Sequence, residues 1–362
     1  MKGALNLGKL AGIKVWLHWS FLLLVAWIVI MESQRGSDLQ TILLSITFML
    51  VIFFCIVLHE LGHALTARRY GIQTKKITLL PIGGVASLEK MPEDPKQELL
   101  VALAGPAVNL IIAGLLYFFV GPLDQFIDPE NPDTIGAISG DNFIFYLFFT
   151  NILIVIFNAI PAFPMDGGRV LRAVLSFTMD RVKATQIAAS LGQILAVGFF
   201  LLGLFSNPFL ILIAIFIFFG ASGEFTMVQH LSMLRGFQAD DAMLTKLTLL
   251  HPEDNLQKVG DVLLASTERN FIVTEEERVV GVLYHSQIIQ AFKEGHKELQ
   301  VKDLMDRDLL SVSPGEKLTE VYRKARRRRD AFFPVLEEGQ LIGSIDMENI
   351  NEFMIVQGGR DY

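Results

Sequence analysis

The chain has 362 residues, of which 52% are hydrophobic, and its mean hydropathy is +0.45. Soluble globular domains rarely reach this hydrophobicity, and a net charge of −7 gives no support to nucleic-acid binding. The single cysteine, Cys55, excludes an intramolecular disulfide. Because apolar residues are concentrated before residue 230, we expect a membrane domain at 1–235 and a soluble domain at 236–362.

Six apolar segments in the first domain are long enough to be membrane-spanning helices. The first follows several lysines and lacks a small-residue cleavage site, so we interpret it as a retained span. The predicted fold class is an all-α polytopic membrane domain followed by an α/β domain. The six predicted spans are residues 16–31, 41–64, 97–120, 142–165, 186–205 and 208–227.

Lysine and arginine residues lie on alternate sides of these spans. They precede the first span, follow the sixth, and occupy the loops after the second and the fourth. The loop at 121–141 has no Lys or Arg and five acidic residues. Because cytoplasmic loops carry the excess of basic residues, both termini are predicted to be cytoplasmic. We therefore expect a multi-pass protein of the cell membrane.

The second predicted span ends in His59-Glu60-Leu61-Gly62-His63, an HExxH motif. Positions four apart share one face of a helix, so His59 and His63 can bind one metal ion. Glu60 lies beside them and can accept a proton from a water on the metal. The preceding 18 residues, 41–58, are uncharged, which places the motif in a bilayer. Ionisable groups at that depth are costly and mark function.

Asp166 is the best candidate for a third ligand, since catalytic zinc sites usually have three protein ligands. It ends the fourth predicted span at the depth of the HExxH motif. Pro161 and Pro164 break that helix, and Gly167-Gly168 allows a sharp turn. Irregular backbone at membrane depth is tolerated where it lines a cavity or is buried in protein. A carboxylate placed there needs a partner, and zinc is a suitable one.

HExxH on one span and the run from Asn158 to Gly168 on a later one resemble the site-2 protease family of intramembrane zinc metalloproteases. His18-Trp-Ser, Leu80-Pro-Ile-Gly-Gly84 and Gly105-Pro-Ala-Val-Asn109 follow in the family's order, and the resemblance covers about residues 10–230. It implies a helical bundle that admits water from the cytoplasm. It also implies one zinc ion per chain with Glu60 as catalytic base. The implied zinc ligands are His59, His63 and Asp166.

Four further residues are candidates for binding substrate or the developing oxyanion. Asn158 and Asn109 could donate hydrogen bonds to either, or they could instead cap a broken helix and join neighbouring helices. Residues 76–88 alternate as in a short β-hairpin that turns at Gly83 and Gly84 and enters the membrane near the zinc. Its open edge could pair with an unwound substrate strand, or the hairpin could be a plain connection.

The second domain contains an internal repeat, with copies at about 240–296 and 300–355. Each copy is predicted to be strand, helix, strand, strand, helix. Leu250-His-Pro-Glu-Asp-Asn-Leu256 is echoed by Val312-Ser-Pro-Gly-Glu-Lys-Leu318, and Phe271-Ile-Val273 by Phe333-Pro-Val335. This pattern resembles a tandem pair of cystathionine-β-synthase (CBS) domains, which in many proteins bind adenine nucleotides.

The resemblance leaves nucleotide binding open. Gln287 and Asn349 stand where the family often has an aspartate for the ribose, and an amide binds a hydroxyl more weakly than a carboxylate. The alternatives to a bound adenine nucleotide are dimerisation with a second copy and docking of substrate.

These features predict an intramembrane zinc endopeptidase that cuts in or near a transmembrane segment and is modulated by its CBS pair. Its expected partners are a single-span membrane protein, membrane lipid and a second copy of the chain. The alternative is a transporter or channel gated by the CBS domains. A transporter would need charges along a path, whereas the ionisable groups here cluster at one depth.

Overall fold

The computed structural model describes residues 4–81, 83–88, 91–120, 138–296, 298–328 and 330–359. The chain folds as two compact units, Met1–Thr226 and Met227–Tyr362. Most of the predicted outer loop at 121–141 lies outside the described residues. The division between the units falls ahead of the boundary predicted at residue 235.

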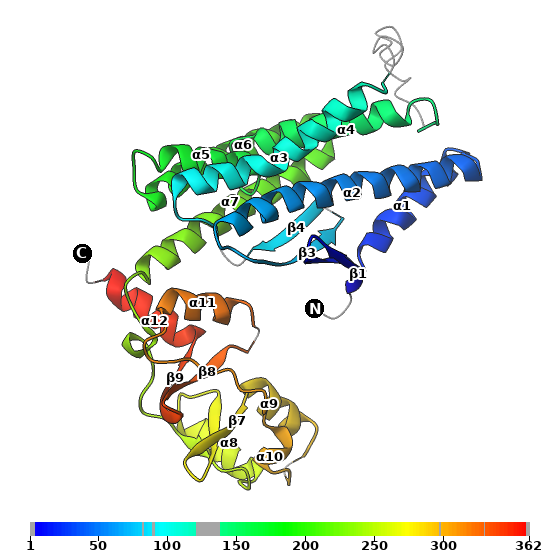
Figure 1. Cartoon of the computed structure of the whole chain (residues 1–362). Helices are drawn as coiled ribbons and strands as arrows, with labels where there is room; N and C mark the ends of the chain where they lie inside the picture. Colours follow the sequence, from blue (N-terminus) through cyan, green and yellow to red (C-terminus); the bar gives the residue numbers. More distant parts are fainter. Residues whose placement is uncertain are drawn as a thin grey trace. The chain divides into compact units, whose positions relative to one another are not determined.

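Helices make up most of the first unit (Figure 1). Four of the described helices are long and apolar enough to cross a membrane: α2 (Leu39–Arg69), α3 (Pro95–Tyr117), α6 (Arg181–Phe205) and α7 (Pro208–Met233). Two more, α1 (Phe21–Gln34) and α4 (Phe143–Ala159), are apolar but shorter. A count of six spans therefore stays a prediction. Large apolar side chains such as Phe205 and Phe219 point outward, as a surface facing lipid would require.

Aspartate residues begin three of the long helices. Asp38, Asp94 and Asp180 accept hydrogen bonds from backbone N–H groups in the first turns of α2, α3 and α6. These bonds satisfy donors that have no partner within the helix. In α3 the cap is followed by Pro95 at the first helical position, where its missing N–H costs nothing.

The N-terminal segment forms strands where the sequence predicted the start of a helix. β1 (Ala4–Leu10) pairs with β2 (Ile13–His18), and β2 pairs in parallel with β3 (Thr74–Leu80). The prediction of a span from residue 16 was therefore wrong at its beginning, because residues 16–18 complete β2 and α1 begins later. The predicted hairpin is confirmed, because β3 pairs with β4 (Gly83–Leu88) in the sheet order β1-β2-β3-β4. The predicted turn at Gly83 and Gly84 was wrong, because these residues pair with Leu80 and Leu79 as the first residues of β4. The hairpin is the edge half of a larger sheet.

The fourth predicted span is interrupted as the prolines indicated. α4 ends at Ala159, and α5 (Asp166–Leu175) begins at the candidate ligand. α3 packs against both α2 and α4 (Figure 1). At Gly62 an added Cβ would lie 2.7 Å from the carbonyl oxygen of Ala104, so glycine lets α2 and α3 approach closely.

The second unit contains the predicted repeat. The first copy consists of β5 (Leu249–Leu250), α8 (Leu256–Ala265), β6 (Phe271–Glu275), β7 (Arg278–Leu283) and α9 (His285–Lys293). The second consists of α11 (Leu318–Arg326), β8 (Phe332–Glu337), β9 (Gln340–Asp346) and α12 (Met347–Gly358). The short helices η3 (Ala239–Asp241) and α10 (Val301–Leu304) precede the copies. The first strand of the second copy is reduced to a single parallel bridge between Val312 and Val335.

Each copy has an apolar core of its own, around Phe271 in the first and Phe333 in the second. The last turns of α7 belong to the second of these cores. Leu234 is fully buried in it, and Met227 and Leu231 pack against it. This packing explains why the unit boundary lies inside α7.

Candidate metal centre

The structure brings the three predicted metal ligands together. Oδ2 of Asp166 lies 3.1 Å from Nε2 of His59 and 3.0 Å from Nε2 of His63, and the two Nε2 atoms are 3.1 Å apart. All three side chains are buried. Within the described ranges they are the one group of three His, Cys, Asp or Glu residues whose ligand atoms lie within 4.8 Å of one another.

Each histidine is held by its second ring nitrogen. Nδ1 of His63 lies 2.7 Å from the carbonyl oxygen of Val101, and Nδ1 of His59 lies 2.5 Å from Oδ1 of Asn109. A carbonyl oxygen can only accept, so Nδ1 of His63 carries the proton and Nε2 keeps its lone pair for the site. Metal-binding histidines are oriented in this way.

A chain of amides determines the orientation of His59. Nδ2 of Asn151 donates to the carbonyl oxygen of Leu147 at 2.8 Å, which leaves Oδ1 of Asn151 to accept from Nδ2 of Asn109 at 2.7 Å. Oδ1 of Asn109 therefore faces His59 and accepts from its Nδ1. Both asparagines are fully buried. Asn109 is placed to hold His59, which is a role different from binding substrate.

Sequence reasoning did not identify Asn151. The signal was present, because Asn151 is an amide in the middle of the mostly apolar α4, and buried polar groups in such helices usually contact a neighbouring helix. The sequence did not show that Asn151 contacts Asn109, the residue that holds His59.

Gly105 is the second residue whose role was missed. It lies where α3 passes the two histidines, and an added Cβ would be 2.1 Å from Nε2 of His63 and 2.6 Å from Nε2 of His59. Any side chain at this position would occupy the space between the ligand nitrogens. The glycine thus keeps that space open.

Asp166 is held from its own helix. It is the first residue of α5, where the positive end of the helix dipole favours a carboxylate. Its Oδ2 faces the histidines, while Oδ1 lies 3.4 Å from Nη1 of Arg169. Gly167 and Gly168 allow the turn to pack on the preceding backbone, since an added Cβ would lie 2.2 Å from the carbonyl oxygen of Ile160 and 2.6 Å from the carbonyl carbon of Ala162, respectively.

The edge strand β4 passes beside Glu60. An added Cβ on Gly84 would lie 3.0 Å from Cγ of Glu60 and 3.0 Å from Cγ2 of Ile56. Gly83, which begins β4, precedes this contact.

Asn158 makes a contact within its own helix. It is half-buried near the end of α4, and its Nδ2 donates to the carbonyl oxygen of Ile154 in the same helix at 3.0 Å.

Comparison with known proteins gives three kinds of match. The family model described as peptidase family M50 matches residues 47–132 and 133–204, and the CBS domain model matches residues 301–355. A zinc metalloprotease of Methanocaldococcus jannaschii is 34% identical over 357 residues, covering 98% of this chain and 97% of the relative. The solved site-2 protease from that organism is 39% identical over 61% of this chain and 94% of its own, with a TM-score of 0.45. The crystal structure of CBSX2 in complex with AMP is 20% identical over 33% of this chain and 98% of its own, with a TM-score of 0.31.

Proposed function

Because the chain belongs to peptidase family M50, the site-2 proteases, we propose that this zinc metalloprotease cleaves a peptide bond in or near a transmembrane segment of a membrane-protein substrate. The observation that carries the proposal is the convergence of His59, His63 and Asp166 among apolar helices of a multi-pass membrane protein. Family membership favours this activity over the alternative of a transporter or channel gated by CBS domains.

The donor set is suitable for zinc. Two imidazole nitrogens and a carboxylate oxygen are a common set in catalytic zinc sites, and they leave a position for water or substrate. Both Nε2 atoms face the site, and Gly105 leaves the space between them open. A zinc ion held there would lower the pKa of a water to about 7 and polarise a peptide carbonyl.

We assign Glu60 as the general base. It follows His59 on α2 and lies against β4, so a peptide seated on that strand would be within its reach. In this role Glu60 accepts the proton of the attacking water and passes it to the leaving amine.

We assign β4 as the place where substrate binds. β4 is the last strand in the order β1-β2-β3-β4, so its outer edge has no partner strand within that sheet. An extended peptide could add to this edge through backbone hydrogen bonds. Gly84 has no side chain to hold the peptide away from Glu60. A transmembrane helix must unwind to bind in this way, so Gly, Pro or Asn near the cut should favour cleavage.

The distribution of basic residues supports cytoplasmic termini and a metal site near the cytoplasmic ends of the spans. We propose that a single-span protein is the substrate and that the second unit modulates its cleavage from the same side.

Adenine nucleotides are expected to bind the second unit modestly. Oε1 of Gln287 accepts from the backbone N–H of Tyr284 at 2.9 Å, and Oδ1 of Asn349 accepts from that of Asp346 at 3.1 Å. Both amide oxygens thus cap α9 and α12, which leaves one lone pair on each oxygen beside the N–H donors for a ribose. Calorimetry of the full chain with AMP and ATP tests this expectation, and sub-micromolar binding would contradict it. Dimerisation and docking of substrate are the alternative roles.

Comparing Glu60→Gln with Asp166→Ala tests the proposed function. We expect about one zinc per chain in the wild type and in Glu60→Gln, and loss of zinc in Asp166→Ala. Glu60→Gln should retain uncleaved single-span proteins that the wild type releases as fragments, which identifies substrates by pull-down from membranes. Cleavage by Glu60→Gln at the wild-type rate would place the base elsewhere. Full zinc occupancy in Asp166→Ala would remove Asp166 from the site.

A further inference from the structure

Four charged side chains lie together in the first unit, apart from the metal ligands. They come from four helices: Glu98 on α3, Arg172 on α5, Arg181 on α6 and Glu224 on α7. The side chains of Glu98 and Arg172 are 0% exposed, and that of Glu224 is 32% exposed. Two carboxylates and two guanidinium groups balance, so the cluster carries no net charge.

Arg172 is at the centre of this cluster. Its Nε donates to Oε1 of Glu98 at 2.8 Å, and its Nη1 donates to Oε1 of Glu224 at 2.6 Å. Nη1 of Arg181 donates to Oε2 of Glu98 at 2.7 Å. The guanidinium of Arg172 also lies over the ring of Phe163, 4.9 Å from its centroid. Removing one partner of a buried ion pair leaves an uncompensated charge, so these contacts hold Arg172 firmly.

Arg172 and the candidate ligand Asp166 belong to the same short helix. α5 has 10 residues, and Asp166 is its first. A helix this short moves as a rigid element, so a shift or rotation at Arg172 is carried to Asp166. The turn before α5 packs closely on the backbone through Gly167 and Gly168. The cluster therefore fixes the end of α5 that is remote from the metal site.

Glu224 connects this arrangement with α7, the helix that continues into the second unit. Nδ1 of His230 on α7 lies 2.7 Å from the hydroxyl oxygen of Tyr322 on α11. Leu234, just after α7, is fully buried in the core of the second CBS copy. Glu224 and His230 lie less than two turns apart on one helix. A displacement of the end of α7 would therefore move the carboxylate of Glu224 against Arg172.

We infer that Glu224 positions Asp166 through Arg172, and that α7 thereby transmits the state of the second unit to the metal site. The inference rests on the proposed function, because Asp166 acts here as a zinc ligand. Glu224 and Arg172 are positioning residues in this scheme. An ion pair that only stabilises the fold would change the free energy of unfolding and leave metal affinity unchanged.

Glu224→Gln in the full chain tests the first step. Glutamine keeps the size of the side chain and removes its charge, and the partial exposure of Glu224 limits the cost. The readouts are the affinity for Co²⁺, measured against a chelator, and the visible absorption of bound Co²⁺, which reports ligand arrangement. We expect an affinity loss of about tenfold, as for other residues that orient metal ligands, and a changed spectrum.

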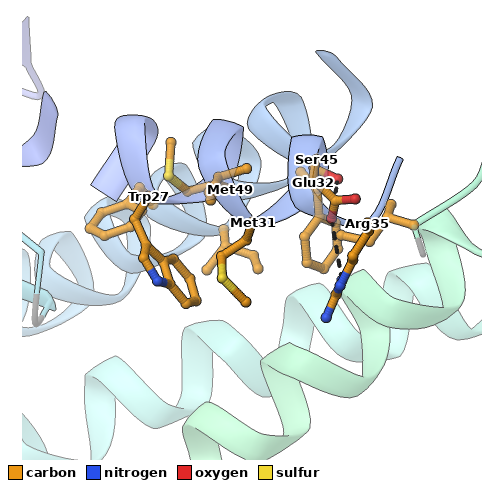
Figure 2. A pocket seen from close by; sticks show the side chains of 11 residues that line it. Trp27, Met31, Glu32, Arg35, Ser45 and Met49 are labelled. Carbon is orange, nitrogen blue, oxygen red and sulfur yellow. Dashed lines mark hydrogen bonds and ion pairs between the residues drawn. The ribbon is translucent and has the colours of Figure 1, made fainter. Parts of the chain in front are cut away.

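Glu32→Gln is the matched control. Glu32 is a buried carboxylate of the first unit that likewise accepts hydrogen bonds from other side chains, those of Arg35, Ser37 and Ser45. Glu32 lines a pocket of about 280 Å³, most of whose lining side chains are apolar residues of α1 and α2. Figure 2 shows Glu32 beside Ser45 and Arg35 in this pocket. Because none of the contacts that the described residues make with Glu32 involves the cluster around Arg172, its variant should bind Co²⁺ as the wild type does.

Unchanged Co²⁺ affinity and spectrum in Glu224→Gln would overturn the inference, as would an equal loss in Glu32→Gln. If Glu224→Gln does not fold, as judged by gel filtration and thermal unfolding, Glu224→Asp replaces it. Aspartate keeps the charge and shortens the side chain by one methylene, so a smaller loss in the same direction is expected. Wild-type Co²⁺ binding in that variant would equally refute the positioning role.

A double-mutant cycle tests transmission along α7. Tyr322→Phe removes the hydroxyl that faces His230, and it should change Co²⁺ affinity about twofold in the wild-type background. The change should disappear in Glu224→Gln, because the route is already interrupted there. Equal changes in both backgrounds, or none in the wild type, would exclude transmission through Glu224. Peptide cleavage is measured separately: chains that show these Co²⁺ effects and cleave nothing would refute the proposed function alone.

Discussion

The two units of this chain build their interiors from different kinds of contact. In the first unit, buried polar side chains contact other polar side chains between the helices: Asn109 donates to Asn151, and Arg172 donates to Glu98. In the second unit the cores are apolar. Among its described residues Ser344 is the one buried polar or charged side chain, with tyrosine counted as apolar.

The difference follows from the solvent around each unit. Burial of apolar surface contributes little to the association of helices that are already in lipid, so close packing at small residues and polar contacts specify how these helices fit together. In water, apolar burial is the dominant favourable term in folding. Polar residues of the first unit should therefore control metal binding, whereas apolar residues of the second should control stability.

The largest expected effect is loss of zinc in Gly105→Ala. The new Cβ would lie 2.1 Å from Nε2 of His63, so the ligand nitrogens cannot keep their places. Gly114→Ala is the matched control on the same helix, because an added Cβ there meets nothing within 4 Å. Metal analysis of both purified variants checks this prediction. A full complement of zinc in Gly105→Ala would show that α3 does not border the metal.

Leu283→Ala should lower the stability of the second unit and leave zinc binding unchanged. Leu283 is fully buried in the first core of the second unit, so its truncation should cost about 2–5 kcal/mol of that unit's stability. Zinc content of the folded chain should stay the same. Proteolysis of the second unit in increasing denaturant measures the loss. Leu264→Ala, at a residue that is 88% exposed, should change stability by no more than about 0.5 kcal/mol. Loss of zinc in Leu283→Ala would contradict the expectation that apolar residues of the second unit control stability and not metal binding.

Asn109→Ala should weaken zinc binding about 10- to 100-fold, which corresponds to roughly 1.4–2.7 kcal/mol. The variant removes the acceptor for Nδ1 of His59 and the donor to Asn151. Asn158→Ala is the control, because that amide bonds only to its own helix among the contacts described above. Competition with a chelator measures both affinities. Wild-type affinity combined with lost cleavage in Asn109→Ala would instead support a role in binding substrate or the oxyanion.

The candidate ligands could be predicted because their signals are local. His59 and His63 are one helical turn apart, and the prolines before Asp166 indicate a break in the helix. Gly105 and Asn151 could not be assigned in the same way. The helices that carry them are apolar around most of their circumference, so the sequence does not show which face meets α2. That information exists only in the packing.

The N-terminal strands were missed for a related reason. The apolar run at Trp16 and Leu17 continues toward α1 and reads as one long span. Its strand character depends on pairing with β3, which is remote in the sequence. The repeat of the second unit was predictable because alternation and turn residues appear twice in the same order. The one predicted strand that the second copy does not form in full is its first, which is a single bridge at Val312.

The smallest expected effect concerns a carboxyl of the second unit. Burial raises the pKa of Asp346 above its ordinary value of 3.8, although the side chain also accepts a hydrogen bond from the backbone N–H of Asn349 at 2.9 Å. A raised pKa means that the folded chain holds this proton more tightly than the unfolded chain. Its contribution to stability is thus complete below the ordinary pKa and is lost as the pH rises through the folded pKa.

Asp346→Asn should therefore gain stability relative to the wild type as the pH rises toward neutrality, because asparagine caps α12 without becoming charged. Thermal unfolding of both chains across this pH range measures the difference.

Asp254→Asn should show the opposite trend, a loss of stability relative to the wild type as the pH rises. Burial opposes the shift at Asp254, but hydrogen bonds from Lys258 and His251 hold its pKa below the ordinary value. Its stabilising contribution is present above that value and fades as the pH falls through the folded pKa. Parallel pH profiles for the two variants would show that neither carboxyl is the source of the dependence.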